Sequence, residues 1–350
     1  KLINLINKRI ALSISAGALI EDKNRELIEI NHIQDSVIDL LVHYKRAFIV
    51  GGAGTGKTWI GIKKIKKCLQ DGLKPLYICY NRALADMVSK LFSGQAECYN
   101  FDSLMFKLLK SKALDAPEKF GCKEYSALLD KIDVTKYDLV IVDEGQDFSE
   151  DWAYCVNLFV KDDGELFVLF DESQNIFQRD FADKFYINNP PFVLRYNIRN
   201  TSNIYDYAKT RSGLGLDTLS NQIEGVEPEY KMFTRKSALI SYLDSTVNKL
   251  VNKEGVSKNK IIILSDRKKD KSVLNDINSV AGFSLDTDYD DDTEAIMYRT
   301  IQGFKGLESD IVIFINHTYK NEPQTDRKRA LLYTALTRAR FFMYCLDYEE

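Results

Sequence analysis

The sequence predicts an α/β protein with two domains, each built on a parallel sheet that helices cover on both faces. Short apolar runs alternate with helical patterns from about residue 30 to the end of the chain, as in sheets whose parallel strands are joined through helices. The chain has 350 residues, enough for about two domains of ordinary size. We interpret as strands the apolar runs at residues 47–50, 75–80, 139–142, 166–170, 192–194, 261–264, 297–300, 311–315 and 341–346.

The boundary between the domains is predicted at Pro190 and Pro191. Consecutive prolines end the element before them and stiffen the link that follows. We therefore expect a lead or linker segment over residues 1–29, a first domain over 30–190 and a second domain over 191–350.

Composition argues against a zinc-binding, a disulfide-rich or a membrane-spanning protein. The six cysteines include no C-x-x-C pair and only three histidines accompany them, so neither a zinc site nor a disulfide framework is indicated. This usage favours reduced thiols in a cytoplasmic protein. No apolar run reaches the roughly 18 residues of a membrane span, so we expect no membrane partner. The net charge of −3 argues against a wholly basic surface, but a local basic cleft for nucleic acid remains open.

A glycine-rich loop carries the first candidate site. Gly51–Thr58, GGAGTGKT, fits the pattern G-x-x-x-x-G-K-[ST], in which loop N–H groups cradle phosphates, the lysine reaches the β and γ oxygens, and the last hydroxyl binds Mg²⁺. An apolar strand precedes the loop, and helical spacing of apolar residues follows it from Trp59 to Leu69, as the pattern requires. The alternative, a glycine-rich turn that carries a lysine by coincidence, leaves this context unexplained. We expect ATP and Mg²⁺ to bind through Gly52, Gly54, Thr55, Gly56, Lys57 and Thr58.

A pair of carboxylates forms the second candidate site. Asp143 and Glu144 follow the apolar strand at 139–142, where ligands of open α/β sheets bind. Beside a phosphate-binding loop, Asp143 can hold Mg²⁺, directly or through water, and Glu144 can orient and deprotonate the attacking water. The alternative is a helix N-terminus enriched in acids. The preceding strand and the loop at Lys57 favour the catalytic interpretation.

These motifs resemble those of superfamily 1 helicases of the UvrD/Rep-like group. DEGQDF after the glycine-rich loop resembles motif II of that family, and further motifs follow in the family's order. They are Ile30–Gln34 for the Q-motif, Cys79–Val88 for motif Ia, Asn100–Leu104 for motif Ib, Phe167–Phe177 for motif III, Leu194–Thr201 for motif IV, Thr300–Glu308 for motif V and Tyr333–Arg340 for motif VI.

The resemblance implies two RecA-like P-loop NTPase domains with ATP bound between them. It places Gln34 at the adenine, Gln174 at the γ-phosphate, and Gly306 and Glu308 at the nucleotide, with Glu308 meeting the ribose. The expected catalytic residues are Lys57, Glu144, Gln174, Arg199 and Arg338. Both arginines lie beyond the proline link, so they reach the phosphates from the second domain, where a guanidinium suits phosphate oxygens.

The resemblance also implies translocation on single-stranded DNA or a partial duplex, in the 3′→5′ direction. Two departures bear on this expectation. Ile198 stands where the family has a tyrosine stacked on adenine, and Arg179-Asp180 stand where DNA-translocating members have a Trp-Arg pair whose tryptophan stacks on a base. The remaining candidates for nucleic-acid contact are Tyr80, Asn81, Phe101 and Phe177, and each aromatic one fits a core position equally well.

Spacing excludes the large inserted subdomains (1B and 2B) of full-size helicases. About 40 residues separate motifs Ib and II, and about 100 separate motifs IV and V. Such a compact core resembles those fused behind a nuclease-related (NERD-type) domain, and the first residue, Lys1, fits a fragment. A second function is therefore an ATP-driven regulatory switch that gates an attached nuclease. A P-loop kinase of small molecules leaves motifs III to VI unexplained.

One segment imitates a secretion signal, because Lys8 and Arg9 precede the apolar run Ile10–Ile20. Two serines and a glycine dilute this run, and a phosphate-transfer site needs cytosolic ATP. We therefore expect a cytoplasmic protein.

Overall fold

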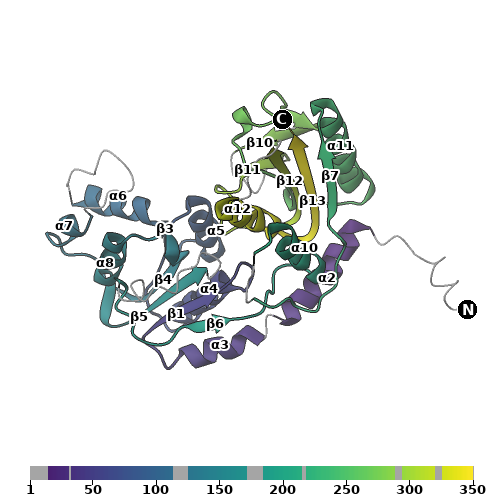
Figure 1. Cartoon of the computed structure of the whole chain (residues 1–350). Coiled ribbons are helices and arrows are strands. Elements are labelled where there is room, and N and C mark those ends of the chain that lie inside the picture. Colours follow the sequence, from purple (N-terminus) through teal and green to yellow (C-terminus); the bar gives the residue numbers. More distant parts are fainter. Residues whose placement is uncertain are drawn as a thin grey trace, which may run out of the picture.

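The computed structural model describes residues 15–30, 33–112, 125–171, 184–214, 218–287, 294–319 and 325–349. Two separate sheets of mainly parallel strands form two lobes, and helices lie against each sheet (Figure 1). The predicted α/β class is confirmed, with two sheets whose strands pair mainly in parallel. The first lobe comprises the first sheet with helices α3 to α8, and the second lobe comprises the second sheet with α2 and α10 to α12.

The first sheet has six strands in the order β3-β2-β4-β5-β1-β6, all paired in parallel. Ile49 and Ile141 face one core while Val50 and Val142 face the other, because successive side chains of a strand point to opposite faces. Both faces of this sheet are therefore covered. Its strands are β1 (Arg46–Gly51), β2 (Pro75–Cys79), β3 (Glu97–Asn100), β4 (Tyr137–Asp143), β5 (Val160–Asp171) and β6 (Phe192–Leu194).

Two groups of helices cover these faces. Buried side chains of α3 (Ile33–Leu41), α4 (Lys57–Gln70) and α5 (Arg82–Phe92) join the core on one face. Those of α6 (Phe101–Ser111), α7 (Tyr125–Leu129) and α8 (Glu150–Leu158) join the core on the other.

The second sheet has seven strands in the order β7-β13-β12-β8-β11-β10-β9. All its pairs are parallel except β9 with β10. Its strands are β7 (Glu229–Phe233), β8 (Ile261–Ser265), β9 (Ser279–Val280), β10 (Phe283–Asp286), β11 (Ile296–Thr300), β12 (Ser309–Thr318) and β13 (Ala339–Glu349).

Helices also cover both faces of the second sheet. α2 (Ala16–Ile30) and α11 (Lys236–Asn248) contribute to the core on one face. α10 (Ser202–Ser212) and α12 (Asp326–Leu336) contribute to the opposite core, which continues into the first lobe. The two lobes therefore meet through apolar side chains as well as through the polar contacts described below.

Every apolar run interpreted as a strand coincides with a strand of the structure. The strands that the sequence did not predict are β3, β7, β9 and β10. β7 lies at an edge of its sheet with four of its five residues exposed, and β9 has two residues. Short or exposed strands lack the continuous apolar run that identifies a strand buried on both faces.

Two segments near the predicted domain boundaries contact a lobe to which the predicted division does not assign them. The division at residue 190 stays a prediction, yet β6, which follows the prolines, still pairs with β1 in the first sheet. Residues 16–29 of the predicted lead segment belong to α2, and Ala16 and Ile20 of this helix are buried in the core of the second lobe. The N–H of Ala16 also donates to Glu254 Oε2 at 3.0 Å.

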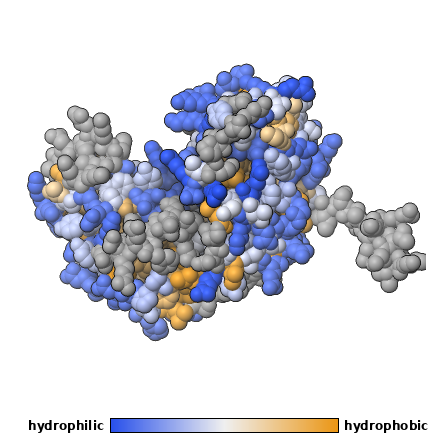
Figure 2. Space-filling model, in the orientation of Figure 1, coloured by the Kyte–Doolittle hydropathy of each residue, from blue (hydrophilic) through white to orange (hydrophobic). Residues whose placement is uncertain are grey.

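Hydrophilic residues cover much of the described surface on both lobes in this view (Figure 2). Among the helices that the structure describes, none combines the length and the apolar composition that crossing a membrane requires.

The position of α2 leads to a stability prediction. Ile20 is 2% exposed, so Ile20→Ala should lower the free energy of unfolding by about 2–5 kcal/mol, through lost apolar contact and the cavity left behind. Urea unfolding followed by circular dichroism would measure the change. Glu21→Ala, at an exposed position of the same helix, should change stability by less than about 0.5 kcal/mol. Equal stabilities of the two variants would contradict the docking of α2 on the second lobe.

Candidate active site

The glycine-rich loop joins β1 to α4 through a backbone that only glycine adopts without strain. Gly54 and Gly56 have φ angles of 78° and 85°, in the left-handed region. A Cβ on Gly54 would also lie 2.5 Å from Asn197 Nδ2. Gly56 precedes the first turn of α4, whose backbone N–H groups have no partner within the helix and suit an anion.

Lys57 is buried and turned onto its own loop. Its Nζ donates to the carbonyl oxygens of Gly51 at 2.7 Å and Gly52 at 2.9 Å, and lies 3.6 Å from Asp171 Oδ2. The hydroxyl of Thr55 also donates to the Gly52 carbonyl, at 2.9 Å. The Gly52 carbonyl and the Thr55 hydroxyl therefore stabilise the conformation of the loop through a hydrogen bond, and Lys57 supplies its positive charge.

Asp143 lies at the carboxyl end of β4, beneath the loop. Its Oδ2 accepts hydrogen bonds from the Thr58 hydroxyl and the Tyr77 hydroxyl, both at 2.7 Å. Burial and the neighbouring charge of Glu144 raise the pKa of Asp143, and those hydrogen bonds oppose the rise.

These oxygens fit Mg²⁺. A hydroxyl and a carboxylate are hard donors, and Mg²⁺ commonly uses one or two carboxylates together with substrate phosphates. The described residues contain no cluster of three or more His, Cys, Asp or Glu that could hold a metal ion by themselves. Thr58 and Asp143 would therefore share the ion with a bound nucleotide.

Glu144 has an unusual backbone conformation for a residue with a side chain. Its φ of 55° is left-handed, which is uncommon outside glycine and is often found at functional sites. Its carboxylate accepts a hydrogen bond from the Gln146 side chain and lies 3.6 Å from Lys305 Nζ. Lys305 comes from the second lobe and also bonds Asp147 at 2.7 Å. Burial opposes the charge of Lys305, but the carboxylates of Glu144 and Asp147 raise its pKa.

Arg199, Arg338 and Arg340 line the cavity together with residues of the loop. Arg199 Nε donates to Glu308 Oε2, and Arg340 Nε lies 3.5 Å from Glu308 Oε1. Desolvation in the cavity alone would raise the pKa of Glu308, but the charges of Arg199 and Arg340 lower it. Arg338 is buried and donates to the carbonyl oxygens of Leu307 at 3.0 Å and Thr334 at 3.2 Å. Burial and the charge of Arg199 lower the pKa of Arg338 to about 10, so it remains charged at neutral pH.

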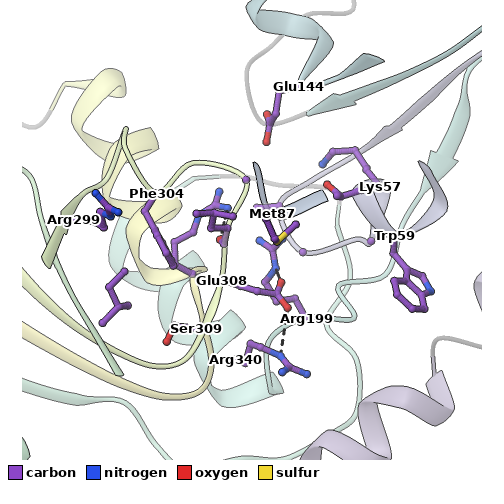
Figure 3. A pocket seen from close by; sticks show the side chains of 18 of the residues that line it. Lys57, Trp59, Met87, Glu144, Arg199, Arg299, Phe304, Glu308, Ser309 and Arg340 are labelled. Carbon is purple, nitrogen blue, oxygen red and sulfur yellow. Dashed lines mark hydrogen bonds and ion pairs between the residues drawn. The ribbon is translucent and has the colours of Figure 1, made fainter. Parts of the chain in front are cut away.

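One cavity of about 300 Å³ lies between the lobes and collects most of the residues predicted to bind or act on the nucleotide. Figure 3 shows Lys57 and Glu144 on the side of the first lobe, with Glu308, Arg199 and Arg340 across from them. The predicted residues that line the cavity are Gly54, Gly56, Lys57, Thr58, Glu144, Arg199, Gly306, Glu308 and Arg338.

A buried pair of asparagines connects the loop to the segment that carries Arg338. Asn197 Nδ2 donates to the Ala53 carbonyl at 3.0 Å and to Asn200 Oδ1 at 2.8 Å. Asn200 Nδ2 in turn donates to the carbonyl of Thr337 at 3.0 Å and to that of Ala339. Two side chains therefore span the distance between the phosphate-binding loop and the start of β13.

Other predicted residues are not among the described residues that line this cavity. Gln174 and Phe177 are outside the described residues, and so is the side chain of Gln34, whose backbone belongs to α3. Asn81 caps α5 by accepting from the Ala83 N–H at 2.9 Å, and it donates to the Lys305 carbonyl at 2.8 Å. Its side chain therefore holds the second lobe against the first.

The aromatic candidates divide into core and surface. Phe101 is fully buried and stacks on Trp152 at 4.3 Å between ring centroids, so of its two alternatives the structure shows the core position. An apolar residue at the start of an amphipathic helix packs inward unless another residue displaces it. Tyr80 is 54% exposed and also stacks on Trp152, with 6.0 Å between the two ring centroids.

The sequence did not identify Asp171, Lys305, Asn197 and Trp59 as residues of the site. Asp171 had the same signal as Asp143, an acid at the carboxyl end of an apolar run. The other three had none, because Lys305 reaches Glu144 and Asn197 reaches the loop only through tertiary structure, and Trp59 fits the apolar spacing of α4.

Two segments of the chain match models of known protein families. Residues 34–179 match the model of an AAA domain, and residues 297–341 match that of the UvrD-like helicase C-terminal domain. These matches indicate a UvrD-like superfamily 1 helicase core. Enzymes of this class hydrolyse ATP, and the two α/β lobes are the architecture expected of RecA-like domains.

Among solved structures, the helicase core is similar to the crystal structure of Arterivirus nonstructural protein 10, a helicase. The identity is 14% and the TM-score is 0.41, over 86% of this chain and 59% of that chain. The core therefore spans 59% of the length of that helicase. No curated protein sequence matches the chain.

The asparagine pair yields a second prediction. Asn200→Ala removes three buried hydrogen bonds, each worth about 1 kcal/mol, and should lower the free energy of unfolding by about 2–4 kcal/mol. Asn252→Ala removes one hydrogen bond at an exposed site and should change stability by less than about 0.5 kcal/mol. Urea unfolding would compare them, and an unchanged midpoint for Asn200→Ala would show that the pair does not support the native structure.

Proposed function

We propose that this helicase core hydrolyses Mg-ATP in the cavity between its lobes and uses the cycle to move along single-stranded DNA or a partial duplex. One observation carries the ATPase proposal: Lys57 and Glu144 of the first lobe border the same cavity as Arg199 and Arg338. The 3′→5′ direction is proposed on the family resemblance.

Each residue has a proposed role. Lys57 and the N–H groups around Gly54 and Gly56 bind the phosphates, and Thr58 and Asp143 hold Mg²⁺, which neutralises phosphate charge. Glu144 accepts the proton of the attacking water. Arg199 and Arg338 stabilise charge on the transferred phosphoryl group, an arrangement worth about 10³–10⁵ in rate in related systems. The proposed nucleotide contacts beyond the phosphates are Gln34, Gln174, Gly306 and Glu308.

The cavity offers a physical route from hydrolysis to movement. Cations of both lobes face it, so a bound triphosphate would attract the lobes toward one another through charge. Loss of the γ-phosphate removes part of that attraction. A change in lobe spacing of this kind is the hinge closure by which nucleotide binding drives mechanical work.

The proposed contact with nucleic acid begins at Tyr80. This residue follows the carboxyl end of β2, and its ring extends the stack of Trp152 and Phe101 toward solvent. An exposed aromatic face stacks on a nucleic-acid base without reading its sequence. Beyond the carboxyl end of β8, Arg267 lies over the ring of Tyr319 at 5.3 Å and supplies a cation beside a second exposed aromatic.

A second function, a switch that gates an attached nuclease, is favoured by the position of α2. Because α2 packs on the second lobe, a domain joined ahead of it would move with that lobe when the cavity closes. ATP binding and hydrolysis would then switch the nuclease between active and inactive states without processive unwinding of a duplex.

Two substitutions test the assigned chemistry. Lys57→Ala should abolish ATP turnover, because the phosphates lose their principal cation. Glu144→Gln should lower kcat by about 10²–10⁴-fold while ATP binding stays within a few-fold, because only proton transfer is lost. A coupled phosphate-release assay and calorimetry would measure both. The exposed changes Lys66→Ala and Glu150→Gln serve as controls that should leave turnover unchanged. Near-normal turnover in Glu144→Gln would show that another group is the base.

The ATPase rate with and without single-stranded DNA distinguishes motor from switch. A translocase should be stimulated severalfold, and the DNA concentration for half-maximal stimulation should rise steeply between about 50 and 200 mM salt, because phosphate contacts release counterions. Tyr80→Ala should weaken the stimulation while leaving the DNA-free rate intact. A rate that DNA does not change at any salt concentration would contradict translocation and support the switch.

A further inference from the structure

Arg340 lines the cavity from the first residues of β13, and the sequence assigned it no role of its own. Each nitrogen of its guanidinium has a different partner. Nε lies 3.5 Å from Glu308 Oε1, Nη1 donates to Asp310 Oδ1 at 3.0 Å, and Nη2 donates to Asn24 Oδ1 at 2.5 Å. Figure 3 shows the ion pair with Glu308 as a dashed line. The planar fork of an arginine fixes the directions of several partners at once, which a lysine ammonium does not.

The two arginines beside Glu308 have different surroundings. Arg199 bonds Oε2 of Glu308, and under the proposed function Arg199 turns toward the transferred phosphoryl group. Arg340 is held on its other nitrogens by Asp310 and Asn24, which are not among the described residues that line the cavity. Arg340 therefore remains beside Glu308 when Arg199 turns away.

Asn24 connects this contact to the N-terminal helix. It belongs to α2, which packs on the second lobe through the buried side chains of Ala16 and Ile20. The next helix along the chain, α3, contributes to the core of the first lobe, and Figure 1 shows α2 running from the second lobe toward α3. α2 is thus attached to the second lobe by packing and to the first lobe through the chain. Its position beside Arg340 therefore depends on how the lobes are arranged.

We propose that Arg340 is a positioning residue that holds Glu308 toward the ribose of the bound nucleotide, and that Asn24 makes this positioning depend on α2. The inference rests on the proposed contact of Glu308 with the ribose. A carboxylate that is already held in place loses less side-chain entropy when it accepts hydrogen bonds from the ribose hydroxyls. A domain joined ahead of α2 would therefore change the affinity for the nucleotide without touching it.

Two ligands that differ only in the ribose test the role of Arg340. They are ADP and 2′,3′-dideoxyADP, each with Mg²⁺, and calorimetry measures their affinities. Arg340→Ala should weaken ADP about 5- to 30-fold, because Glu308 loses most of one hydrogen bond to the ribose, and should leave the dideoxy nucleotide within about twofold. Arg340→Lys keeps the charge but not the fork, so it should recover only part of the loss. Asp310 has a second cation, Lys260, at 3.5 Å, so neither variant leaves this carboxylate without one.

Asn24→Ala tests the connection to α2. It should weaken ADP about 3- to 10-fold, because Arg340 loses one hydrogen bond, and should leave the dideoxy nucleotide within about twofold. Adding Asn24→Ala to Arg340→Ala should cause no further loss, because Asn24 acts through Arg340. Asp22→Ala, at an exposed position of the same helix, is the matched control and should change neither ligand.

The possible results separate this inference from the proposed function. Unchanged ADP affinity in Arg340→Ala would overturn the positioning role, and so would an equal loss for both ligands, which would show general damage to the cavity. Unchanged ADP affinity in Asn24→Ala would overturn the connection to α2. A wild-type protein that binds both ligands equally would contradict the contact of Glu308 with the ribose, and one that binds neither would contradict nucleotide binding itself.

Discussion

Two hydrogen bonds to one carbonyl oxygen fix the geometry on which the site depends. The carbonyl of Gly54 accepts the N–H groups of Ile198 at 2.8 Å and Arg199 at 3.1 Å. They attach the phosphate-binding loop directly to the segment that leads into the second lobe. Asn197 and Asn200 continue this connection to the backbone beside Arg338. Because buried hydrogen bonds are costly to leave unmade, the loop and the arginines are held in one arrangement.

The cavity and its surroundings carry opposed charges rather than a basic surface. Lys57 faces Asp171, Arg199 faces Glu308, and Lys305 faces Asp147. A protein with a net charge of −3 can thus concentrate cations where phosphates would lie and still remain balanced around them. An anionic ligand would compete with these carboxylates for the same cations, so binding and rearrangement of ion pairs are linked.

Parallel pairing explains why segments far apart in sequence meet here. Gly51 at the end of β1 is in register with Asp171 at the end of β5 and with Leu194 at the end of β6. The loops that follow such strands lie at the same edge of the sheet, where ligands of α/β proteins bind. The second lobe reaches this edge through Lys305 and Gly306, where a Cβ on Gly306 would lie 2.7 Å from a Leu84 methyl carbon. Only a residue without a side chain allows the lobes to approach this closely.

The sequence by itself determined the α/β class, the buried strands and the loop that ends at Thr58, because each depends on spacing within a few residues. It also placed Asp143 and Glu144 at the carboxyl end of an apolar strand, where the structure has them. Only the tertiary structure decided that Phe101 is core, that Trp59 borders the cavity and that α2 belongs to the second lobe. Local periodicity shows which apolar side chains share one face of an element. Whether such a side chain is buried depends on which distant segment packs against that face.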